Sequence, residues 1–466
     1  MYKYENFDDE QIINLSLTEK QNWLTALHTS LQAEILEPDK RASILRNIGN
    51  LHYAMANYRE TESYYQQALS LFERLNDEIE IAVTYGEIAN VCFRQGRLDE
   101  ALQIRQEIQL PIYQRLGDKR SYAICQQAMI DILFVRGELD EALQILQQEV
   151  IPTFERLNSE YDWAMALGQI ADIYQKQGKL EAALQIRLQK EMPIYERLGN
   201  AWSRAVCFGC IADIYQMQGR FDAALQIRQQ EEMPIYKHSG DVRAQTICLG
   251  KIADILFFRG ELEEVLRIRQ QEEMPVYKRL GDMRELAICL GKIADILYLR
   301  GELEEALRIQ QQEEMPIYEH LGDIRSRAVC LGKIADILYL RGELEEVLRI
   351  RQQEEIPIYE HLGDIRSRAI CFGNIADVYQ AQGYIEVALQ IRQEEEIPVY
   401  EQLGDLRSLL ITRWQIAKQY MRMTPPRRTE ANQLLCQALQ AARKMRIPEA
   451  GQIEAILQDF GMTCQG

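Results

Sequence analysis

One column of acidic side chains recurs along this chain and is the pattern with the clearest chemical meaning. Aspartate returns every 41 residues, and asparagine takes the two earliest positions of the series. The members are Asn50, Asn90, Asp131, Asp172, Asp213, Asp254, Asp295, Asp336 and Asp377. Carboxylates aligned on one surface concentrate negative potential and attract a basic ligand. Lysine stands three residues before some of them, at Lys251, Lys292 and Lys333, so pairing inside the protein is the competing interpretation.

No motif of an enzyme accompanies this column. The sequence contains neither a Gly-x-Ser-x-Gly nucleophile motif nor a GxxxxGK phosphate loop. Among the five histidines, His320 and His361 are 41 residues apart, which the repeat explains. Cys207 and Cys210 form one CxxC without the second pair that a zinc site needs. We therefore expect no catalytic residues, no metal, no cofactor and no enzymatic activity.

A second recurring column consists of cysteine. Its members are Cys125, Cys207, Cys248, Cys289, Cys330 and Cys371. A small side chain buried in an apolar contact explains such a column better than a ladder of redox thiols. The acidic start of the chain has no apolar core of a secretory signal. We expect all ten cysteines to be free thiols in a reducing cytoplasm.

Charge and hydropathy narrow the class of partner. The chain has 466 residues, 47% of them hydrophobic and 27% charged, as expected of a folded, soluble protein. Its 71 acidic residues outnumber 53 basic ones, giving a formal net charge of −18. This excess argues against nucleic acid and against an anionic membrane surface as partners. No apolar run reaches the length of a transmembrane helix.

The elements that carry these columns are predicted to be helical hairpins. The triplet Ile-Ala-Asp and its variants mark about ten repeats over roughly residues 40–445. Residues 287–327 and 328–368 differ at only four of 41 positions, which indicates recent duplication. Within a repeat, apolar residues follow helical spacing up to Gly342 and again up to Gly363, where Asp364 suits the cap of the next helix. Strand alternation is absent.

Proline recurs inside the second helix of the repeats. The positions are Pro111, Pro152, Pro193, Pro234, Pro275, Pro316, Pro357 and Pro398. Proline lacks the amide donor and clashes with the preceding turn. We expect a kink at each of these positions, or a break followed by a short final helix.

The first repeat resembles a tetratricopeptide repeat. The match over residues 48–75 includes Gly49, Tyr53, Tyr58, Ala68 and Leu69. The unit of 41 residues is seven longer than usual, about two helical turns, and is similar to the long-helix repeats of the kinesin light chain type. The resemblance implies an all-α, right-handed superhelical solenoid. It also implies a protein-binding scaffold and says little about which partner is bound.

The resemblance also implies a position for the acidic column. In this family the corresponding column faces the concave groove, so the aspartates and asparagines, with Lys251, Lys292, Lys333, Tyr298 and Tyr339, are the candidate partner-binding residues. Contact with a ligand and pairing within the array both remain open. The chaperone-tail clamp of the family is rejected, because Glu87, Ile124 and Ala128 occupy positions where it needs amide or basic groups.

Three further columns lie next to the acidic one. Glycine recurs at Gly86, Gly168, Gly209, Gly250, Gly291, Gly332 and Gly373. Its cost inside a helix favours close packing of neighbouring first helices over clearance for a ligand. The aromatics Phe93, Phe134, Phe257, Tyr298 and Tyr339 can contact a ligand in the groove or belong to the core, and the core is favoured. The Glu pairs beginning at Glu231, Glu272, Glu313, Glu354 and Glu395 are expected on a solvated face, with pairing to Arg228, Arg269 or Arg351 as the alternative.

The two ends of the chain depart from the repeat. Residues 1–40 are predicted to form an N-terminal helical cap through Leu15, Leu17, Trp23, Leu24, Leu27, Leu31 and Ile35. The array is predicted to span 41–423, and 424–466 to form a C-terminal helical cap.

Together these patterns predict a cytoplasmic interaction scaffold that binds a protein or peptide segment, basic in character, in an acidic concave groove. A regulatory subunit that responds to a small ligand or peptide and controls a separate effector is the first alternative. Self-assembly of the near-identical repeats, with homo-oligomers as its product, is the second.

Overall fold

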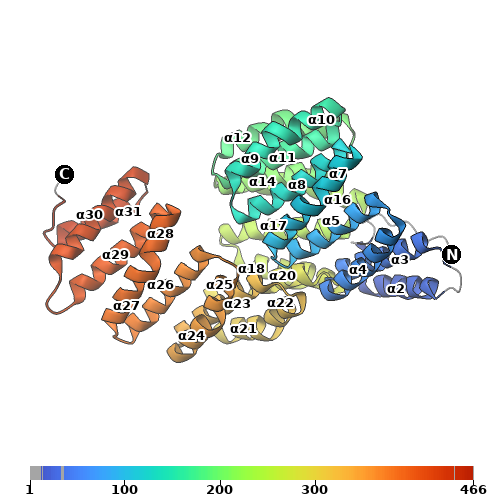
Figure 1. The fold of residues 1–466 in the computed structure, drawn as a ribbon. Helices are drawn as coiled ribbons and strands as arrows, with labels where there is room; N and C mark the ends of the chain where they lie inside the picture. The colour runs from blue at the N-terminus through green and yellow to red at the C-terminus, as the bar shows by residue number, and fades with distance from the viewer. Residues whose placement is uncertain (1–11, 13, 33–35, 446, 465–466) are drawn as a thin grey trace. The chain divides into compact units, whose positions relative to one another are not determined.

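The computed structural model describes residues 12, 14–32, 36–445 and 447–464, and in these ranges all regular secondary structure is helical. Ile35, predicted for the N-terminal cap, lies outside the described residues. The chain divides into two compact units. Unit 1 comprises residues 1–301 and 312–323, and unit 2 comprises 302–311 and 324–466. Successive hairpins stack side by side within each unit (Figure 1). In the described ranges no helix is long and apolar enough to cross a bilayer.

The predicted hairpins are confirmed, from α3–α4 to α29–α30. The first helices are α3 (Pro38–Ala54), α5 (Glu78–Arg94), α8 (Lys119–Arg136), α11 (Glu160–Lys176), α14 (Ala201–Met217), α17 (Val242–Phe258), α20 (Met283–Leu299), α23 (Ile324–Arg341), α26 (Ile365–Ala381) and α29 (Leu406–Arg422). Helix α2 (Leu17–Leu31) precedes them, and α31 (Glu449–Asp459) follows. The array is the superhelical repeat arrangement that the sequence predicts.

The second helices have two forms. Those of the first and last hairpins are continuous α-helices, α4 (Tyr58–Leu75) and α30 (Arg428–Met445). The others are an α-helix, a π-helical segment and a second α-helix in direct succession. They are α6 (Leu98–Gln103), η2 (Ile104–Gln109), α7 (Leu110–Leu116); α9 (Leu139–Ile145), η3 (Leu146–Val150), α10 (Ile151–Leu157); α12 (Leu180–Ile186), η4 (Arg187–Glu191), α13 (Met192–Arg197); α15 (Phe221–Ile227), η5 (Arg228–Glu232), α16 (Met233–Ser239); α18 (Leu262–Arg267), η6 (Ile268–Glu273), α19 (Met274–Leu280); α21 (Leu303–Ile309), η7 (Gln310–Glu314), α22 (Met315–Leu321); α24 (Leu344–Ile350), η8 (Arg351–Glu355), α25 (Ile356–His361); and α27 (Ile385–Ile391), η9 (Arg392–Glu396), α28 (Ile397–Leu403).

The π-helical segments show that the chain does not break at proline, although a break is one of the two expected outcomes. A short final helix is present, but the chain reaches it without a break. In η5 the amide of Met233 donates to the carbonyl of Arg228, a wider turn than in an α-helix. Pro234 follows directly, in the first turn of α16, where its missing amide donor matters least. The wider turn therefore accommodates the proline, which inside a regular α-helix would remove one hydrogen bond and clash with the preceding turn.

The turns between helices follow the predicted chemistry. Gly240 has φ +72° and ends α16 in the left-handed conformation, which a residue without Cβ adopts freely. The carboxylate of Asp241 then accepts from the amide of Ala244, 2.8 Å away, and caps α17. The Gly-Asp pair at 363–364 repeats this arrangement with Ser367 as the donor.

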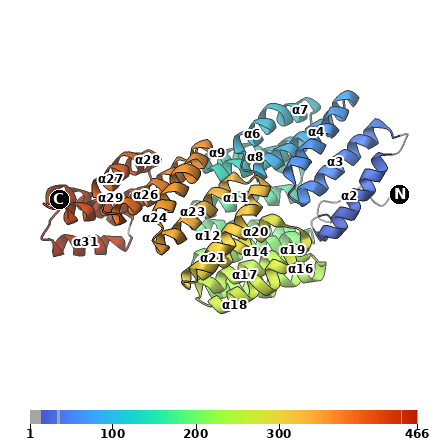
Figure 2. The same cartoon turned by 90° about the horizontal axis from the view of Figure 1, so that it is seen from below.

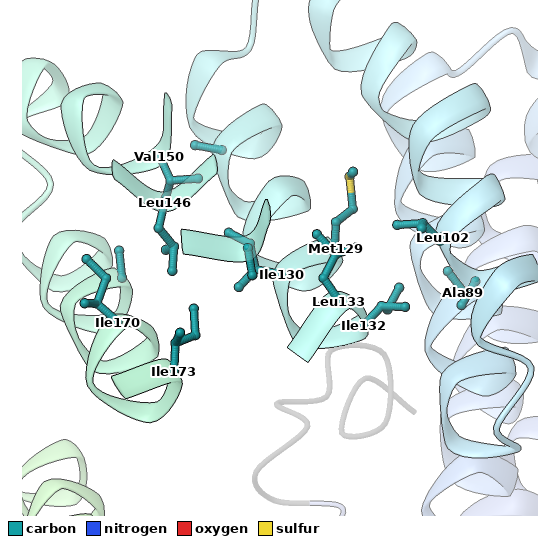
Figure 3. Close-up of a cluster of buried hydrophobic side chains, with 14 of the residues drawn as sticks. Ala89, Leu102, Met129, Ile130, Ile132, Leu133, Leu146, Val150, Ile170 and Ile173 are labelled. Atoms are coloured by element: carbon teal, nitrogen blue, oxygen red, sulfur yellow. The ribbon is translucent and has the colours of Figure 1, made fainter. Parts of the chain in front are cut away.

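The core runs between successive hairpins as a chain of small clusters. In the cluster of Figure 3, Ala89 and Leu102 pack with Met129, Ile132 and Leu133 of α8. The same cluster continues through Leu146 and Val150 of η3 to Ile170 and Ile173 of α11. Each repeat thus buries apolar side chains against its neighbours, as expected of a solenoid.

Two cysteines contradict the expectation of ten free thiols. Cys436 of α30 and Cys464 form a disulfide. The predicted burial of the cysteine column is confirmed, because its six members are 0–2% exposed. In that column the thiol of Cys248 donates to the carbonyl of Arg228 at 3.7 Å.

Candidate functional site

The acidic column lies on the first helices, and most of its aspartates accept a hydrogen bond from a buried arginine of the second helix of the same repeat. The arginine stands 15 residues later, at the start of the π-helical segment. In three repeats the guanidinium donates to Oδ1 at 2.5 Å: Arg228 to Asp213, Arg269 to Asp254 and Arg351 to Asp336. Arg392 and Asp377 are 2.6 Å apart, and Arg187 is bonded to Asp172. We call the aspartates and asparagines of this column the Asp row.

The same arginine binds a second carboxylate four residues later. Nη1 of Arg269 donates to Oε2 of Glu273 at 2.8 Å, and Arg187, Arg228, Arg351 and Arg392 make the equivalent pair. These glutamates are 4–5% exposed. All except Glu191, which follows Lys190, are the second members of the Glu pairs, so the predicted solvated face is wrong for those members. The alternative pairing with arginine is confirmed. Burial raises the pKa of Glu232 and Glu273, while the neighbouring guanidinium lowers it.

We call the aspartate, the arginine and the buried glutamate of one repeat a triad. The two carboxylates of each triad differ in their exposure to solvent. The side chain of Arg351 is 3% exposed and that of Glu355 is 6%, whereas Asp336 is 54% exposed. Asp254 is the most covered of the paired row members, at 23%. The arginine therefore holds each aspartate in place and leaves part of it open to solvent.

The first three repeats lack both arginine–carboxylate pairs, whereas the repeat of α20 keeps Asp295 and the buried Glu314 and has Gln310 at the arginine position. In the second hairpin Arg105 donates to Asn90 Oδ1 and Gln109 Oε1, so amides take the place of both carboxylates. In the first, Tyr65 Oη donates to Asn50 Oδ1 at 2.8 Å. In the third, Leu146 and Val150 occupy the arginine and glutamate positions and are fully buried. Asp131 of that repeat accepts from Gln169 instead.

Two of the lysines contact other aspartates of the Asp row than the ones that the sequence analysis predicted. Lys251 lies 3.6 Å from Asp213, and Lys292 lies 2.6 Å from Asp254. Each lysine thus bridges to the aspartate of the preceding repeat, not to the one three residues later. Lys333 interacts electrostatically with Asp336 of its own repeat. At the position of these lysines Gln169, Cys210, Asn374 and Gln415 stand instead, so Asp131, Asp172, Asp336 and Asp377 have no lysine there.

The glycine column makes room for the buried glutamate. A Cβ placed on Gly209, Gly250 or Gly291 would lie 2.5–2.9 Å from Oε1 of Glu232, Glu273 or Glu314. Close packing was predicted, but between neighbouring first helices. The structure gives the partner as the second helix of the same repeat.

Two rows of exposed apolar side chains flank the Asp row, and the sequence analysis missed them. One row precedes the aspartate by seven residues and the other follows it by four, so both share its helix face. The preceding row contains Ile124, Met165, Val206, Val329, Ile370 and Ile411, 37–48% exposed. The following row contains Val135, Met217, Phe258, Leu299 and Leu340, 44–60% exposed. Their period of 41 was a readable signal in the sequence.

The predicted aromatics lie at the edge of this face. Phe93 and Phe134 are partly buried and pack against the core cluster of Figure 3, as predicted. Tyr339 is 37% exposed, so its assignment to the core is wrong. Tyr298 and Phe257 are half-buried.

Unit 1 also contains contacts between distant repeats. The ammonium of Lys20 in α2 donates to the carbonyl of Leu280 at 2.8 Å, and Asn14 Oδ1 accepts from the amide of Arg243 at 3.1 Å. Arg284 Nη1 donates to the carbonyl of Arg94 at 3.0 Å. Figure 2 shows α2 beside α19. These contacts close the first two hairpins against α17, α19 and α20.

A cavity of about 270 Å³ lies at this closure. Its polar lining is Lys20, Asn50, Tyr53, Tyr58, Tyr65, Glu87, Asn90, Arg94, Arg243, Asp282, Arg284 and Glu285. The two asparagines of the Asp row therefore face it. In the described residues no group of three or more His, Cys, Asp or Glu side chains is arranged to hold a metal ion.

Comparison with known proteins agrees with the fold. The tetratricopeptide repeat family matches residues 40–108. The matched region runs from α3 into η2, and the later hairpins repeat the same arrangement. A search of curated protein sequences finds no match.

Among solved structures, the apo form of the quorum sensor NprR from B. thuringiensis is 15% identical, with a TM-score of 0.51 over 76% of this chain and 98% of that one. A putative kinesin light chain from Podospora anserina with nearly identical TPR-like repeats is 18% identical, with a TM-score of 0.35 over 42% of this chain and 94% of that one. A Rap protein complexed with Competence and Sporulation Factor is 17% identical, with a TM-score of 0.44 over 69% and 80%. At these identities the likeness concerns the fold alone.

Proposed function

We propose that this tetratricopeptide repeat protein is a non-enzymatic, cytoplasmic scaffold that binds a segment of a partner protein on the Asp row. The observation that carries the proposal is a row of partly exposed carboxylates between two rows of exposed apolar side chains, in which Asp172, Asp213, Asp254, Asp336 and Asp377 are each fixed by a buried arginine. Fixed acceptors bind a donor without first losing side-chain freedom. The apolar rows supply the surface that stabilises a complex. A partner segment with alternating basic and apolar side chains fits both features.

Charge predicts where a basic segment binds most strongly. One arginine faces two carboxylates in each triad, so the triad is formally negative. Lys251 and Lys292 offset that charge at Asp213 and Asp254. Asp172 in unit 1 and Asp336 and Asp377 in unit 2 have no lysine from the following repeat, although Lys333 offsets part of the charge at Asp336 from its own repeat. Asp131, which belongs to no triad, adds a carboxylate in the stretch of Asp172. We propose the stretch of Asp172 and that of Asp336 and Asp377 as the electrostatic anchors.

The test compares the wild type with Asp131→Asn, Asp172→Asn, Asp336→Asn and Asp377→Asn combined. At Asp172, Asp336 and Asp377 asparagine keeps the acceptor for arginine, as Asn90 does for Arg105, and at Asp131 it keeps the acceptor for Gln169. A partner captured from the native lysate and purified should bind this variant more weakly, with a smaller dependence of Kd on salt. The matched control changes four exposed glutamates of the second helices, by Glu231→Gln, Glu272→Gln, Glu304→Gln and Glu345→Gln. Equal loss in both variants would reject the Asp row as the site.

The apolar rows are tested separately. Met217→Ser, Phe258→Ser and Leu299→Ser together should raise Kd and leave its salt dependence unchanged. Leu116→Ser, Leu157→Ser and Leu198→Ser are the control, because these leucines are 41–44% exposed at the ends of second helices. If only the control variant lost binding, the interface would lie on the second helices.

A ligand-responsive regulator is the second candidate function. It is supported by the closure of unit 1, where α2 contacts α19 through the bond from Lys20 to Leu280. A ligand that bound the closed and open forms unequally would change this contact. Hydrogen exchange of α2, measured with and without the purified partner, should change under this hypothesis and stay constant under simple scaffolding. Self-assembly, the third hypothesis, predicts light scattering per unit mass that increases with concentration.

A further inference from the structure

We propose that the cavity at the closure of unit 1 binds a small organic anion that carries a carboxylate or phosphate group. This site goes beyond the proposed scaffold, because its ligand is a small molecule and its lining differs from the rest of the Asp row. The volume, about 270 Å³, is near the lower end of the range for small-molecule sites. Three observations carry the proposal: two oriented amides, one buried ammonium and the local balance of charge.

The amides of Asn50 and Asn90 are turned so that their NH₂ groups can face a ligand. Oδ1 of Asn50 accepts from Tyr65, and Oδ1 of Asn90 accepts from Arg105 at 2.6 Å. Both donors lie on second helices, behind the Asp row. Because each amide oxygen is used there, the nitrogen of each side chain points the other way. Both residues line the cavity, so two fixed neutral donors stand where later repeats have carboxylates.

Lys20 supplies a charged donor with little access to solvent. Its side chain lines the cavity and the residue is 1% exposed. The hydrogen bond that the described structure gives it runs to the carbonyl of Leu280, a neutral acceptor. An ammonium has three donors, and a buried charge is stabilised by an anion. Burial lowers the pKa of Lys20 to about 8, and an anion in the cavity would oppose that shift.

The lining is rich in cations compared with the whole chain. Lys20, Arg94, Arg243 and Arg284 face the carboxylates Glu87, Asp282 and Glu285, in a chain of formal charge −18. Arg284 also pairs with Asp323, 3.3 Å away and outside the lining, so the excess of positive charge comes from Lys20 and Arg94. Asp282 is already engaged, since it accepts from Arg243 at 2.6 Å and caps α20. Burial, followed by the charge of Asp282, raises the pKa of Glu285.

Arg94 is the guanidinium best placed to meet a ligand. Its described side-chain bond is from Nε to the hydroxyl of Tyr53, 3.1 Å away, which leaves both terminal NH₂ groups for a bidentate contact. The rings of Tyr53 and Tyr58 are tilted against each other, with centroids 5.9 Å apart, and offer an apolar wall beside it. A ligand with an anionic end and a short carbon skeleton would use both features.

The test titrates the full chain with citrate and with inorganic phosphate, using chloride at matched ionic strength as the reference. Isothermal titration calorimetry gives Kd, and thermal unfolding gives the shift in Tm. At least one of the two anions should bind and raise Tm beyond the chloride reference. Binding of citrate alone assigns the site to carboxylates, and binding of phosphate alone assigns it to phosphate esters. If neither anion shifts Tm beyond chloride, the proposal is wrong.

Asn90→Asp is the decisive variant. It keeps an acceptor for Arg105, as Asp172 does for Arg187, so folding is supported by a native precedent in the same chain. It replaces one donor of the cavity by a negative charge and should weaken anion binding about ten-fold or more. Arg94→Gln should have a similar effect without touching α2. Asp172→Asn makes the reverse change outside the cavity and, like Lys119→Gln, should leave Kd unchanged. Equal Kd in Asn90→Asp and wild type would overturn the assignment.

Discussion

A Cβ atom on Gly250 would lie 2.5 Å from Oε1 of Glu273, closer than two such atoms can approach. Glycine in the middle of α17 is therefore required by a glutamate 23 residues later. The third repeat supports this relationship within the same chain. There Val150 replaces the glutamate, and Gln127 stands at the glycine position. In these two repeats, glycine on the first helix and glutamate on the second helix are therefore either both present or both replaced.

The first prediction concerns this contact. Gly250→Ala should lower the free energy of unfolding by about 1–3 kcal/mol, because the buried, bonded Glu273 cannot move aside freely. Gly451→Ala in α31 should raise it by up to about 1 kcal/mol, since a Cβ there meets nothing within 4 Å and alanine is the better helix former. Urea denaturation measures both. Stabilisation by Gly250→Ala would show that Glu273 is not packed against α17.

The second prediction concerns the contribution of the buried ion pair between Arg228 and Glu232 to stability. Arg228→Met alone should cost about 3–5 kcal/mol, because Glu232 would be left buried without its cation. The double change Arg228→Leu with Glu232→Val should cost much less, as it reproduces the Leu146–Val150 pair of the third repeat. The difference is read from denaturation midpoints at constant m-value. Equal cost in both variants would mean that the ion pair itself, not the unpaired glutamate, governs stability.

Much of the fold could be predicted from the sequence because it depends on local patterns repeated many times. The 41-residue period fixes the hairpins, and the Gly-Asp pairs fix their turns, as at Gly240 and Asp241. The π-helical segments could not be predicted in the same way. They depend on how the chain relaxes around Pro234, and proline is compatible with a kink, a break or a wider turn.

The chemistry of the Asp row was harder to predict, because its partners lie on another helix. An aspartate such as Asp254 has Lys251 three residues before it, whereas the structure pairs it with Arg269 and Lys292. Helical spacing gives neighbours within a helix and does not say how two helices face each other. The combined loss of arginine, glutamate and glycine in the third repeat was the available signal. The bond between Cys436 and Cys464 offered no such signal, because it lies outside the repeat.

The third prediction concerns the thiols. Burial raises the pKa of Cys125 to about 11 and that of Cys248 to about 12, so these thiols should react slowly with Ellman's reagent in the native protein. Burial raises the pKa of Cys210 to about 12 as well, but solvent partly reaches this residue, whereas the other seven free cysteines are buried, so Cys210 should react first. Unfolding should release the eight free thiols, and reduction should then add Cys436 and Cys464. Ten reactive thiols without a reductant would contradict the disulfide.

The fourth prediction concerns pH. Burial raises the pKa of Glu232 above its value in the unfolded chain, despite the opposing effect of Arg228 and of the thiol of Cys248. A carboxyl with a raised pKa holds its proton longer in the folded state, so its contribution to stability is complete below the unfolded pKa of 4.5. That contribution is lost as pH increases through the folded pKa. Glu191, Glu273, Glu355 and Glu396 are shifted in the same direction, so the effects add.

The Arg228→Leu, Glu232→Val variant isolates one of these carboxyls. Its stability relative to wild type should improve as pH is raised from about 4.5 into the neutral range, because the wild type alone loses the contribution of Glu232. Urea denaturation at several pH values measures the difference and cancels the general repulsion of a chain with a formal charge of −18. An unchanged difference would mean that Arg228 compensates fully for burial. A difference of opposite sign would mean that the guanidinium dominates and that the triads act as ordinary stabilising ion pairs.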